Sequence, residues 1–149
     1  MRDELKYGWR KGPVTDVVVT LTASQTIKAK SGRFVYQTSG AMTLNTDGST
    51  RIFGFLDDIG DYTTVSGDKS NCNINLGSVF RVPVISGTMA IGMISDFTDL
   101  NISSSIQGVQ LGASAENTVI VVGGDIDTNL YCDVVMNGAV QGTGSGTDD

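Results

Sequence analysis

The stretch TVIVVGGDIDTNLYCDVVMN, from Thr118 to Asn137, decides the fold that we expect of this chain. Its beginning, 118–122, is apolar at every position after the threonine, which is typical of a strand covered on both faces. In 130–136 every second residue is apolar, as in a strand with one buried face. Gly, Asp and Asn dominate 123–129, as in a turn. The stretch therefore predicts two neighbouring strands at the centre of a small β-domain.

Similar short segments recur along the chain, separated by Gly, Asn, Asp and Ser. The clearest of them are 16–22, 33–37, 42–44, 49–56, 79–84, 100–102 and 107–111. About ten short strands with closely spaced turns predict an all-β fold, a small single-domain β-barrel or sandwich. The segment 88–97 is the one candidate for a short helix, and it is weakened by Gly92.

Three further local features carry expectations about the strands. The polar stretch 57–73 predicts a long excursion loop. Gly54, inside a strand pattern, marks a bulge or a close approach of another chain segment. Pro83 lacks an N–H, so its strand is expected at a sheet edge or at an outward turn.

Composition divides the chain into three parts. Residues 1–15 predict an extended N-terminal arm, because Gly and Pro interrupt any continuous helix there. Residues 16–141 form the β-barrel or sandwich domain. Residues 142–149 hold only Gly, Thr, Ser and Asp. They predict a disordered C-terminal tail, since they have no apolar surface to bury.

The N-terminal arm holds the candidate binding residues. Four of the ten basic residues lie in it, interleaved with a tyrosine and the single tryptophan. Trp, Tyr and Arg are the residues most often central to the energy of protein interfaces. We therefore expect a docking arm made by Tyr7, Trp9, Arg10 and Lys11. The alternative is an N-terminal strand whose Trp9 caps the barrel core.

Charge and hydropathy restrict the partners. The formal net charge of −6 at pH 7 argues against general nucleic-acid binding, which needs a positive field. No apolar run approaches the roughly 20 residues of a membrane span. The N-terminus has acidic residues and no apolar segment, so we expect no secretory signal.

Cys72 and Cys132 are the only cysteines. Cys132 is expected on the apolar face of a strand as a small hydrophobe. Cys72 sits in a polar segment and is expected to be exposed. A single disulfide between the two remains open, whereas two thiols alone do not make a zinc site.

The residues offer little for catalysis. The chain has no histidine, which removes Ser-His and Cys-His pairs and the commonest general base. Asp57, Asp58 and Asp61 cluster after a strand, where a pair of carboxylates is conceivable. A solvated acidic turn is the simpler interpretation, and we favour it. We therefore expect no enzyme and no cofactor.

The segment Asp125–Asn129 begins like a calcium loop, D-x-D-x-N. Leu130 then stands where the loop needs glycine, and Met136 where it needs a bidentate glutamate. The match fails at both positions that discriminate the motif, so we expect no metal site.

Five segments together carry a family resemblance. They are Ile27–Val35 (IKAKSGRFV), Ile52–Phe55 (IFGF), Phe80–Pro83 (FRVP), Ile106–Val109 (IQGV) and Val121–Asp125 (VVGGD). With them, most of residues 14–138 resembles the capsid decoration, or cement, proteins of tailed bacteriophages. None of these motifs is diagnostic by itself.

That resemblance implies a β-barrel-like or β-tulip-like domain with an arm that lies across the major capsid protein. It implies a structural virion protein on the capsid exterior, made in the host cytoplasm, that stabilises the head as a homotrimer and has no enzymatic activity. Three alternatives stay open. They are another virion component such as a head-fibre base, neck or tail-tube protein; a carbohydrate-binding module using Trp9, Tyr62 and Tyr131; and a carboxylate hydrolase using Asp57 or Asp61.

Overall fold

The computed structural model describes residues 7–46, 49–57, 60–112, 115–126 and 130–142. Two single 3₁₀ turns, η2 (Ile91–Met93) and η3 (Gly138–Val140), are the helical elements of this part. The other elements are the strands β1 (Gly8–Lys11), β2 (Asp16–Thr20), β3 (Thr26–Ile27), β4 (Phe34–Thr38), β5 (Ala41–Leu44), β6 (Gly54–Leu56), β7 (Tyr62–Thr63), β8 (Lys69–Asn73), β9 (Val79–Ser86), β10 (Phe97–Ser103), β11 (Ile106–Gln110), β12 (Val119–Gly124) and β13 (Tyr131–Met136). The predicted all-β, single-domain class is confirmed.

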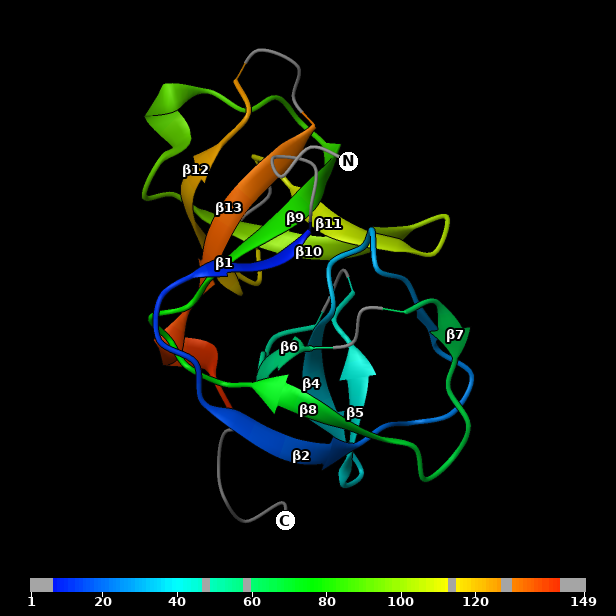
Figure 1. The fold of residues 1–149 in the computed structure, drawn as a ribbon. Coiled ribbons are helices and arrows are strands. Elements are labelled where there is room, and N and C mark those ends of the chain that lie inside the picture. Colours follow the sequence, from blue (N-terminus) through cyan, green and yellow to red (C-terminus); the bar gives the residue numbers. More distant parts are fainter. Residues whose placement is uncertain (1–6, 47–48, 58–59, 113–114, 127–129, 143–149) are drawn as a thin grey trace.

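The upper half of Figure 1 is a closed ring of five strands, which we call barrel A. Its order is β9, β11, β10, β12 and β13, and β13 pairs back onto β9. The contact of β9 with β11 is parallel, and the other pairs are antiparallel. Closure leaves no open edge within the ring. The N-terminal strand β1 is added outside it, along the first half of β9.

The lower half is a second five-stranded sheet, barrel B, in the order β2, β8, β6, β4 and β5. A bridge between Leu21 and Met42 brings the chain after β2 back to β5. The Thr22 N–H supports it by donating to the Met42 carbonyl at 3.0 Å. The short pair β3 and β7 flanks this sheet. The chain therefore starts on barrel A, builds barrel B, and returns to complete barrel A.

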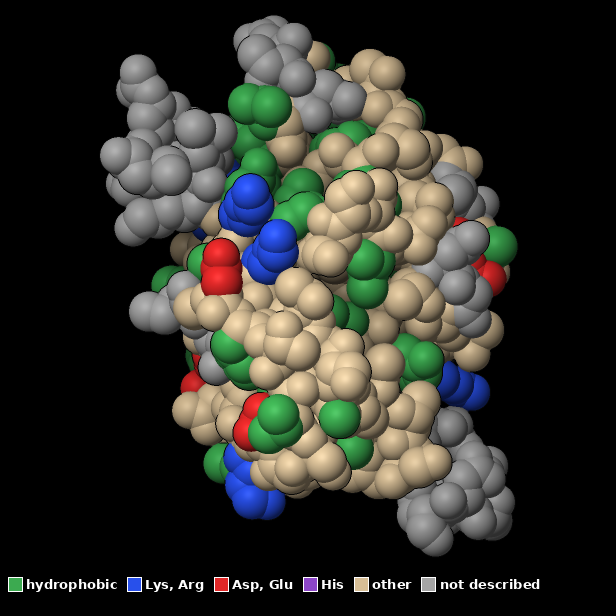
Figure 2. Space-filling view, turned by 90° about the vertical axis from the view of Figure 1, so that its right-hand side faces the viewer, with side chains coloured by type: hydrophobic (Ala, Val, Ile, Leu, Met, Phe, Trp, Pro, Cys, Tyr) green, Lys and Arg blue, Asp and Glu red, His purple; other side chains and the backbone are tan. Residues whose placement is uncertain are grey.

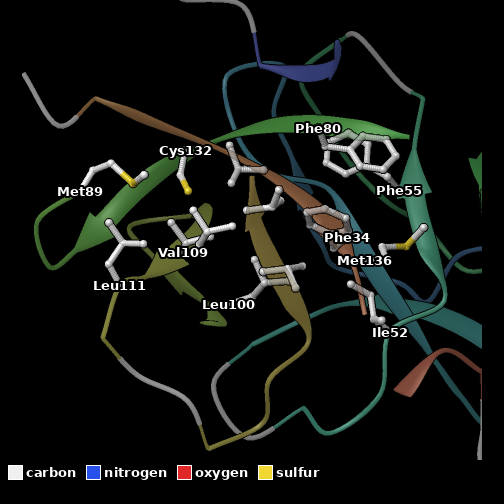
Figure 3. Close-up of a cluster of buried hydrophobic side chains, with 14 residues drawn as sticks. Phe34, Ile52, Phe55, Phe80, Met89, Leu100, Val109, Leu111, Cys132 and Met136 are labelled. Carbon is white, nitrogen blue, oxygen red and sulfur yellow. The ribbon is translucent and has the colours of Figure 1, made fainter. Parts of the chain in front are cut away.

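The main core joins the two halves. Phe34 of β4 and Phe55 of β6 come from barrel B, and Phe80 of β9 comes from barrel A (Figure 3). The Phe55 and Phe80 rings stack with centroids 4.4 Å apart, and Phe34 meets both edge-on at 4.8 and 5.3 Å. All three side chains are buried. Because this cluster crosses the boundary, the halves form one cooperative unit.

Two hairpins follow directly from their turn residues. Ser39 and Gly40 join β4 to β5, and Ser104 and Ser105 join β10 to β11; all four have positive φ. Two consecutive left-handed residues match the twist of the flanking strands. Both turns consist of the Ser and Gly residues that separate the predicted strand segments in the sequence.

The central pair of strands is confirmed, but its expected burial is partly wrong. β12 and β13 are antiparallel neighbours in register from Val119 opposite Met136. Val119 and Val121 are buried, whereas Val122 is 40% exposed, so β12 is covered on its inner face only. Both faces of β12 carry apolar side chains, yet the core of barrel A covers only one of these faces. Leu130 lies outside β13 and is exposed.

Three other expectations change. The helix predicted over 88–97 is reduced to the single turn η2, since β10 already begins at Phe97. The predicted loop 57–73 contains β7 and β8, because pairing with β2 and β6 stabilises a strand of polar composition. Cys72, expected to be exposed, is therefore fully buried in β8.

Pro83 is not on an edge strand, because β9 has neighbours on both sides. The Val84 N–H donates toward β13, to the Leu130 carbonyl at 3.4 Å. Alternation then points the Pro83 nitrogen to the opposite side of β9. On that side β1 pairs with residues 79–81 and β11 with residues from Val84 onward. Pro83 therefore lies between the end of the β1 pairing and the start of the β11 pairing, where its lack of an N–H removes no hydrogen bond of the sheet.

The last two described residues, Gln141 and Gly142, are hydrogen-bonded to the rest of the domain. The Gln141 side chain donates to the Phe53 carbonyl at 3.0 Å and the Ile74 carbonyl at 2.8 Å. The Gly142 N–H donates to the Ile52 carbonyl at 2.9 Å. The rest of the predicted tail, residues 143–149, lies outside the described residues.

Candidate interaction surface

The candidate arm residues lie on barrel A. Residues 8–11 are extended, as predicted, but they form the strand β1, with Gly8 opposite Arg81 and Trp9 opposite Phe80. The segment is therefore the N-terminal strand of the alternative interpretation, held by main-chain pairing with β9. The capping role that this alternative gave to Trp9 is wrong, since the side chain is 48% exposed. β1 presents an indole and, at Lys11, an exposed ammonium group to solvent.

Tyr7 precedes β1 and is partly buried near the beginning of β13, the strand that pairs with the other edge of β9. Its hydroxyl donates to the Leu130 carbonyl at 3.4 Å. Burial raises the pKa of the Tyr7 phenol, and the nearby Arg81 guanidinium offsets part of this rise. Tyr7 thus packs next to Arg81 as a neutral aromatic group.

Arg81 is the centre of a rigid polar group on the outer wall of barrel A. Its Nε and Nη2 donate to the two carboxylate oxygens of Asp133, at 2.8 and 3.0 Å. The guanidinium lies over the Tyr131 ring, 3.8 Å from the ring centroid. These three residues and Tyr7 are the Arg81 platform. The fork geometry and the stacking fix the platform before any partner arrives.

An apolar row continues from the platform across three strands. Phe97 of β10 is opposite Ile120 of β12, and Ile120 is opposite Val135 of β13. Val135 and Asp133 lie two residues apart on β13 and therefore share its outer face. Phe97 is 47% exposed. Tyr, Arg and Phe on a preorganised sheet are the composition of an interface centre rather than of an inert surface.

The side of the molecule shown in Figure 2 has a different character. Uncharged polar side chains and backbone cover most of that view, and charged side chains are few and scattered there. It offers no concentrated field that would steer a charged partner.

The carboxylates that the sequence offered for catalysis lie in two different places. Asp61 Oδ1 accepts a hydrogen bond from the Ala29 N–H at 2.8 Å and so fixes the segment after β3. Asp57 lines a shallow hollow together with Lys69 and Asn71. Asp58 lies outside the described residues. The structure gives Asp57 and Asp61 different neighbours and does not assemble them into one site.

The calcium-like segment does not assemble a site in the described part of the chain. The Asp125 N–H donates to the Tyr131 carbonyl at 3.0 Å, and residues 127–129 lie outside the description. Across the residues that the structure describes, no three His, Cys, Asp or Glu side chains come together as metal ligands. The carbohydrate candidates are also divided, because Tyr62 is in β7 whereas Trp9 and Tyr131 are on barrel A.

Both cysteines are free and fully buried. Burial raises the pKa of each thiol to about 12, with smaller contributions from Asp57 and Asp16 for Cys72 and from Asp133 for Cys132. Both thiols are therefore neutral at pH 7 and poor nucleophiles. They act as packing groups.

Sequence reasoning missed the residues that build the surface and its support. Arg81 and Asp133 looked like ordinary outward positions of two strands, 52 residues apart. Their alternation with buried neighbours placed them on the outer face, but only the pairing of β9 with β13 puts them side by side. No local signal in the sequence identifies that pairing.

No helix within the described residues is both long and apolar enough to cross a membrane. No family model, no curated protein and no solved structure matches this chain. The resemblance to phage decoration proteins thus stays a prediction from the sequence.

Proposed function

We propose that the protein is a structural virion component that binds the outside of a tailed-phage head and stabilises it by bridging major capsid protein subunits, as a homotrimer without enzymatic activity. The observation that carries the proposal is the Arg81 platform beside β1. It combines Tyr7, Tyr131 and a fixed guanidinium with the exposed Trp9. We assign the contact with the capsid to this aromatic end of β1.

The surface is suited to repeated docking. The Arg81–Asp133 pair is already formed, so a partner has few side chains to order on binding. The two side chains are already mostly covered, being 11% and 19% exposed, so a partner has little charge left to desolvate. A protein that decorates a lattice binds as many copies, and linking copies raises overall avidity beyond that of one contact.

The fold also suits an exposed structural protein. Barrel A is a closed ring, and the end of β2 is bridged back to β5 in barrel B. Few strand edges are therefore open to pairing with the wrong chain. A core shared by the two halves lets a load on one be carried by the other.

The test uses expanded, empty heads of the phage whose genome encodes the chain, mixed with the purified protein and sedimented. We expect saturable co-sedimentation and a higher disruption temperature of the heads. W9A should weaken binding at least about tenfold, because exposed tryptophans at interface centres dominate affinity. V65A is the matched control, since Val65 is 62% exposed and lies on the loop that follows β7.

Absence of binding to heads, both before and after expansion, would refute the proposal. Binding to purified tails or necks instead would assign the chain to another part of the virion. Equal affinity of W9A and V65A would remove β1 as the contact with the capsid.

A further inference from the structure

Beside Phe97, on the side of barrel A formed by β10 and β12, the surface contains a slot of about 340 Å³. Its apolar wall is made by Met93, Phe97, Leu111 and Val121, and its polar edge by Asp96 and Asn117. Leu111 and Val121 belong to the buried core, so the floor of the slot is fixed. A volume near the lower end of the roughly 300–1,000 Å³ typical of binding pockets fits one long side chain.

The chemistry of the slot selects a basic side chain. Among the described residues that line it, Asp96 alone is charged, and Asp96 is exposed. A lysine can lay its four methylene groups along Met93 and Phe97 and place its ammonium at the Asp96 carboxylate. The Phe97 ring adds a cation–π attraction for the same group. An acidic or purely apolar side chain would gain only part of these contacts.

The described surface itself supplies a matching group. Lys11 ends β1 and is exposed, one residue beyond Arg10 and two beyond the exposed Trp9. The chain as a whole is acidic, with a net charge of −6, so two copies approach most favourably where a basic segment of one meets an acidic site of the other. We propose that the slot binds Lys11 of a second copy of this chain.

The topology makes this contact head-to-tail. In the ring of barrel A, β10 is separated from β9 by β11 on one side and by β12 and β13 on the other. β10 thus stands across the barrel from β9, whereas Lys11 of β1 is opposite Val79, at the beginning of β9. Lys11 and the slot therefore lie on different sides of one molecule and meet only between molecules. Such a heterologous contact propagates until it closes into a ring.

The two ends of β1 then serve different partners. Tyr7 and Lys11 are four residues apart, or roughly 13 Å along an extended strand. The aromatic end stays available for the capsid while the basic end holds the neighbouring copy. The inference rests on the proposed function only for the expected copy number of three.

The experiment is charge reversal followed by sedimentation equilibrium of the full chain, without phage heads. Wild type should sediment as an assembly of three 15.6 kDa chains. K11E and D96K should each weaken association at least about 100-fold, because each places like charges at the contact. The double variant K11E/D96K should re-associate, since each contact again joins opposite charges.

Matched controls separate this effect from net charge. K30E and D16K change the charge by the same amounts at exposed residues associated with barrel B. Both controls should assemble like wild type and have its unfolding midpoint.

A monomeric wild type at 100 µM (about ten times a typical assay concentration) would overturn the inference, as would single reversals that assemble normally. A monomer that still binds heads supports the proposed contact with the capsid but contradicts the homotrimer. A ring that does not bind heads supports the contact between Lys11 and the slot and refutes the proposed function.

Discussion

The Gln107 side chain pairs with the backbone of Phe34 as a neighbouring strand would. Its Oε1 accepts from the Phe34 N–H at 2.8 Å, and its Nε2 donates to the Phe34 carbonyl at 2.9 Å. The same Nε2 donates to the Asn45 carbonyl at 3.0 Å. Gln107 is fully buried and belongs to β11, whereas Phe34 begins β4. One amide thus fastens barrel A to barrel B beside the phenylalanine cluster.

Q107A should therefore destabilise the whole domain. The substitution removes the side-chain partner of the Phe34 N–H and of the Asn45 carbonyl inside the core, whereas the Phe34 carbonyl keeps the Asn45 N–H at 2.9 Å. We therefore expect the free energy of unfolding to fall by about 3–5 kcal/mol. Urea unfolding followed by Trp9 fluorescence measures it. Q110A, on the same strand but only partly buried, should change it by less than about 0.5 kcal/mol. Equal effects of Q107A and Q110A would show that the Gln107 side chain does not stabilise the contact between barrel A and barrel B.

R81K should lower stability by about 1–2 kcal/mol, although charge is retained. Lysine cannot make the two parallel bonds to Asp133 or stack flat on Tyr131. Thermal unfolding of R81K beside R51K, a matched exchange at a partly exposed arginine, measures the difference. A double-mutant cycle with D133N should give a coupling of about 1–3 kcal/mol. A coupling near zero would contradict a preformed platform.

The two buried thiols predict a loss of stability at alkaline pH. Each pKa is raised from about 9 to about 12, so above pH 9 the unfolded chain releases protons that the folded chain retains. Stability is then full below pH 9 and falls between pH 9 and 12, by about 1 kcal/mol per thiol per pH unit. Urea unfolding at pH 8.5 and 10 checks the slope.

The control for that slope is C72A/C132A. Its absolute stability is lower because two buried sulfur atoms are missing, but its change between pH 8.5 and 10 should be smaller than that of wild type. In the folded wild type, iodoacetamide should label neither cysteine at pH 8, and both should react in urea. Rapid labelling of folded protein would contradict the burial of the thiols.

G54A should be among the most damaging small substitutions. A Cβ at Gly54 would lie 2.5 Å from Cys72 Sγ and 2.7 Å from the Asn73 carbonyl oxygen. Relief of these contacts needs separation of β6 from β8, so we expect a loss of about 2–3 kcal/mol. G92A meets nothing within 4 Å and should be neutral or slightly stabilising. Comparison of the urea midpoints of G54A and G92A tests whether a Cβ at residue 54 clashes with β8. Equal midpoints would refute this clash.

Several parts of the fold were predictable because their cause is local. Alternation in 130–136 placed Cys132 on the buried face, and the Ser and Gly residues between predicted strands marked turns, as at Ser39 and Gly40. Gly54 was expected to allow a close approach, and β8 passes it. Each of these depends on a residue and its immediate neighbours, which the sequence displays directly.

β8 was hidden for a physical reason. Its sequence KSNCN has no apolar residue except Cys72, so nothing in its composition favours a strand. It is held instead by pairing with β2 and β6 and by its own buried polar group. The Asn73 amide accepts from the Thr15 N–H at 3.2 Å and donates to Ser78 Oγ at 2.9 Å. A polar strand of this kind is stable only after its partners are in place.

The sequence by itself determined the all-β class, the positions of several turns, the lack of a histidine, and the side of β13 that is buried. Only the tertiary structure decided that β13 closes onto β9 and that Arg81 meets Asp133. Alternation and turn propensity act between neighbours in the chain. The pairing of strands depends on contacts among residues dozens of positions apart, whose combined energy no local pattern encodes.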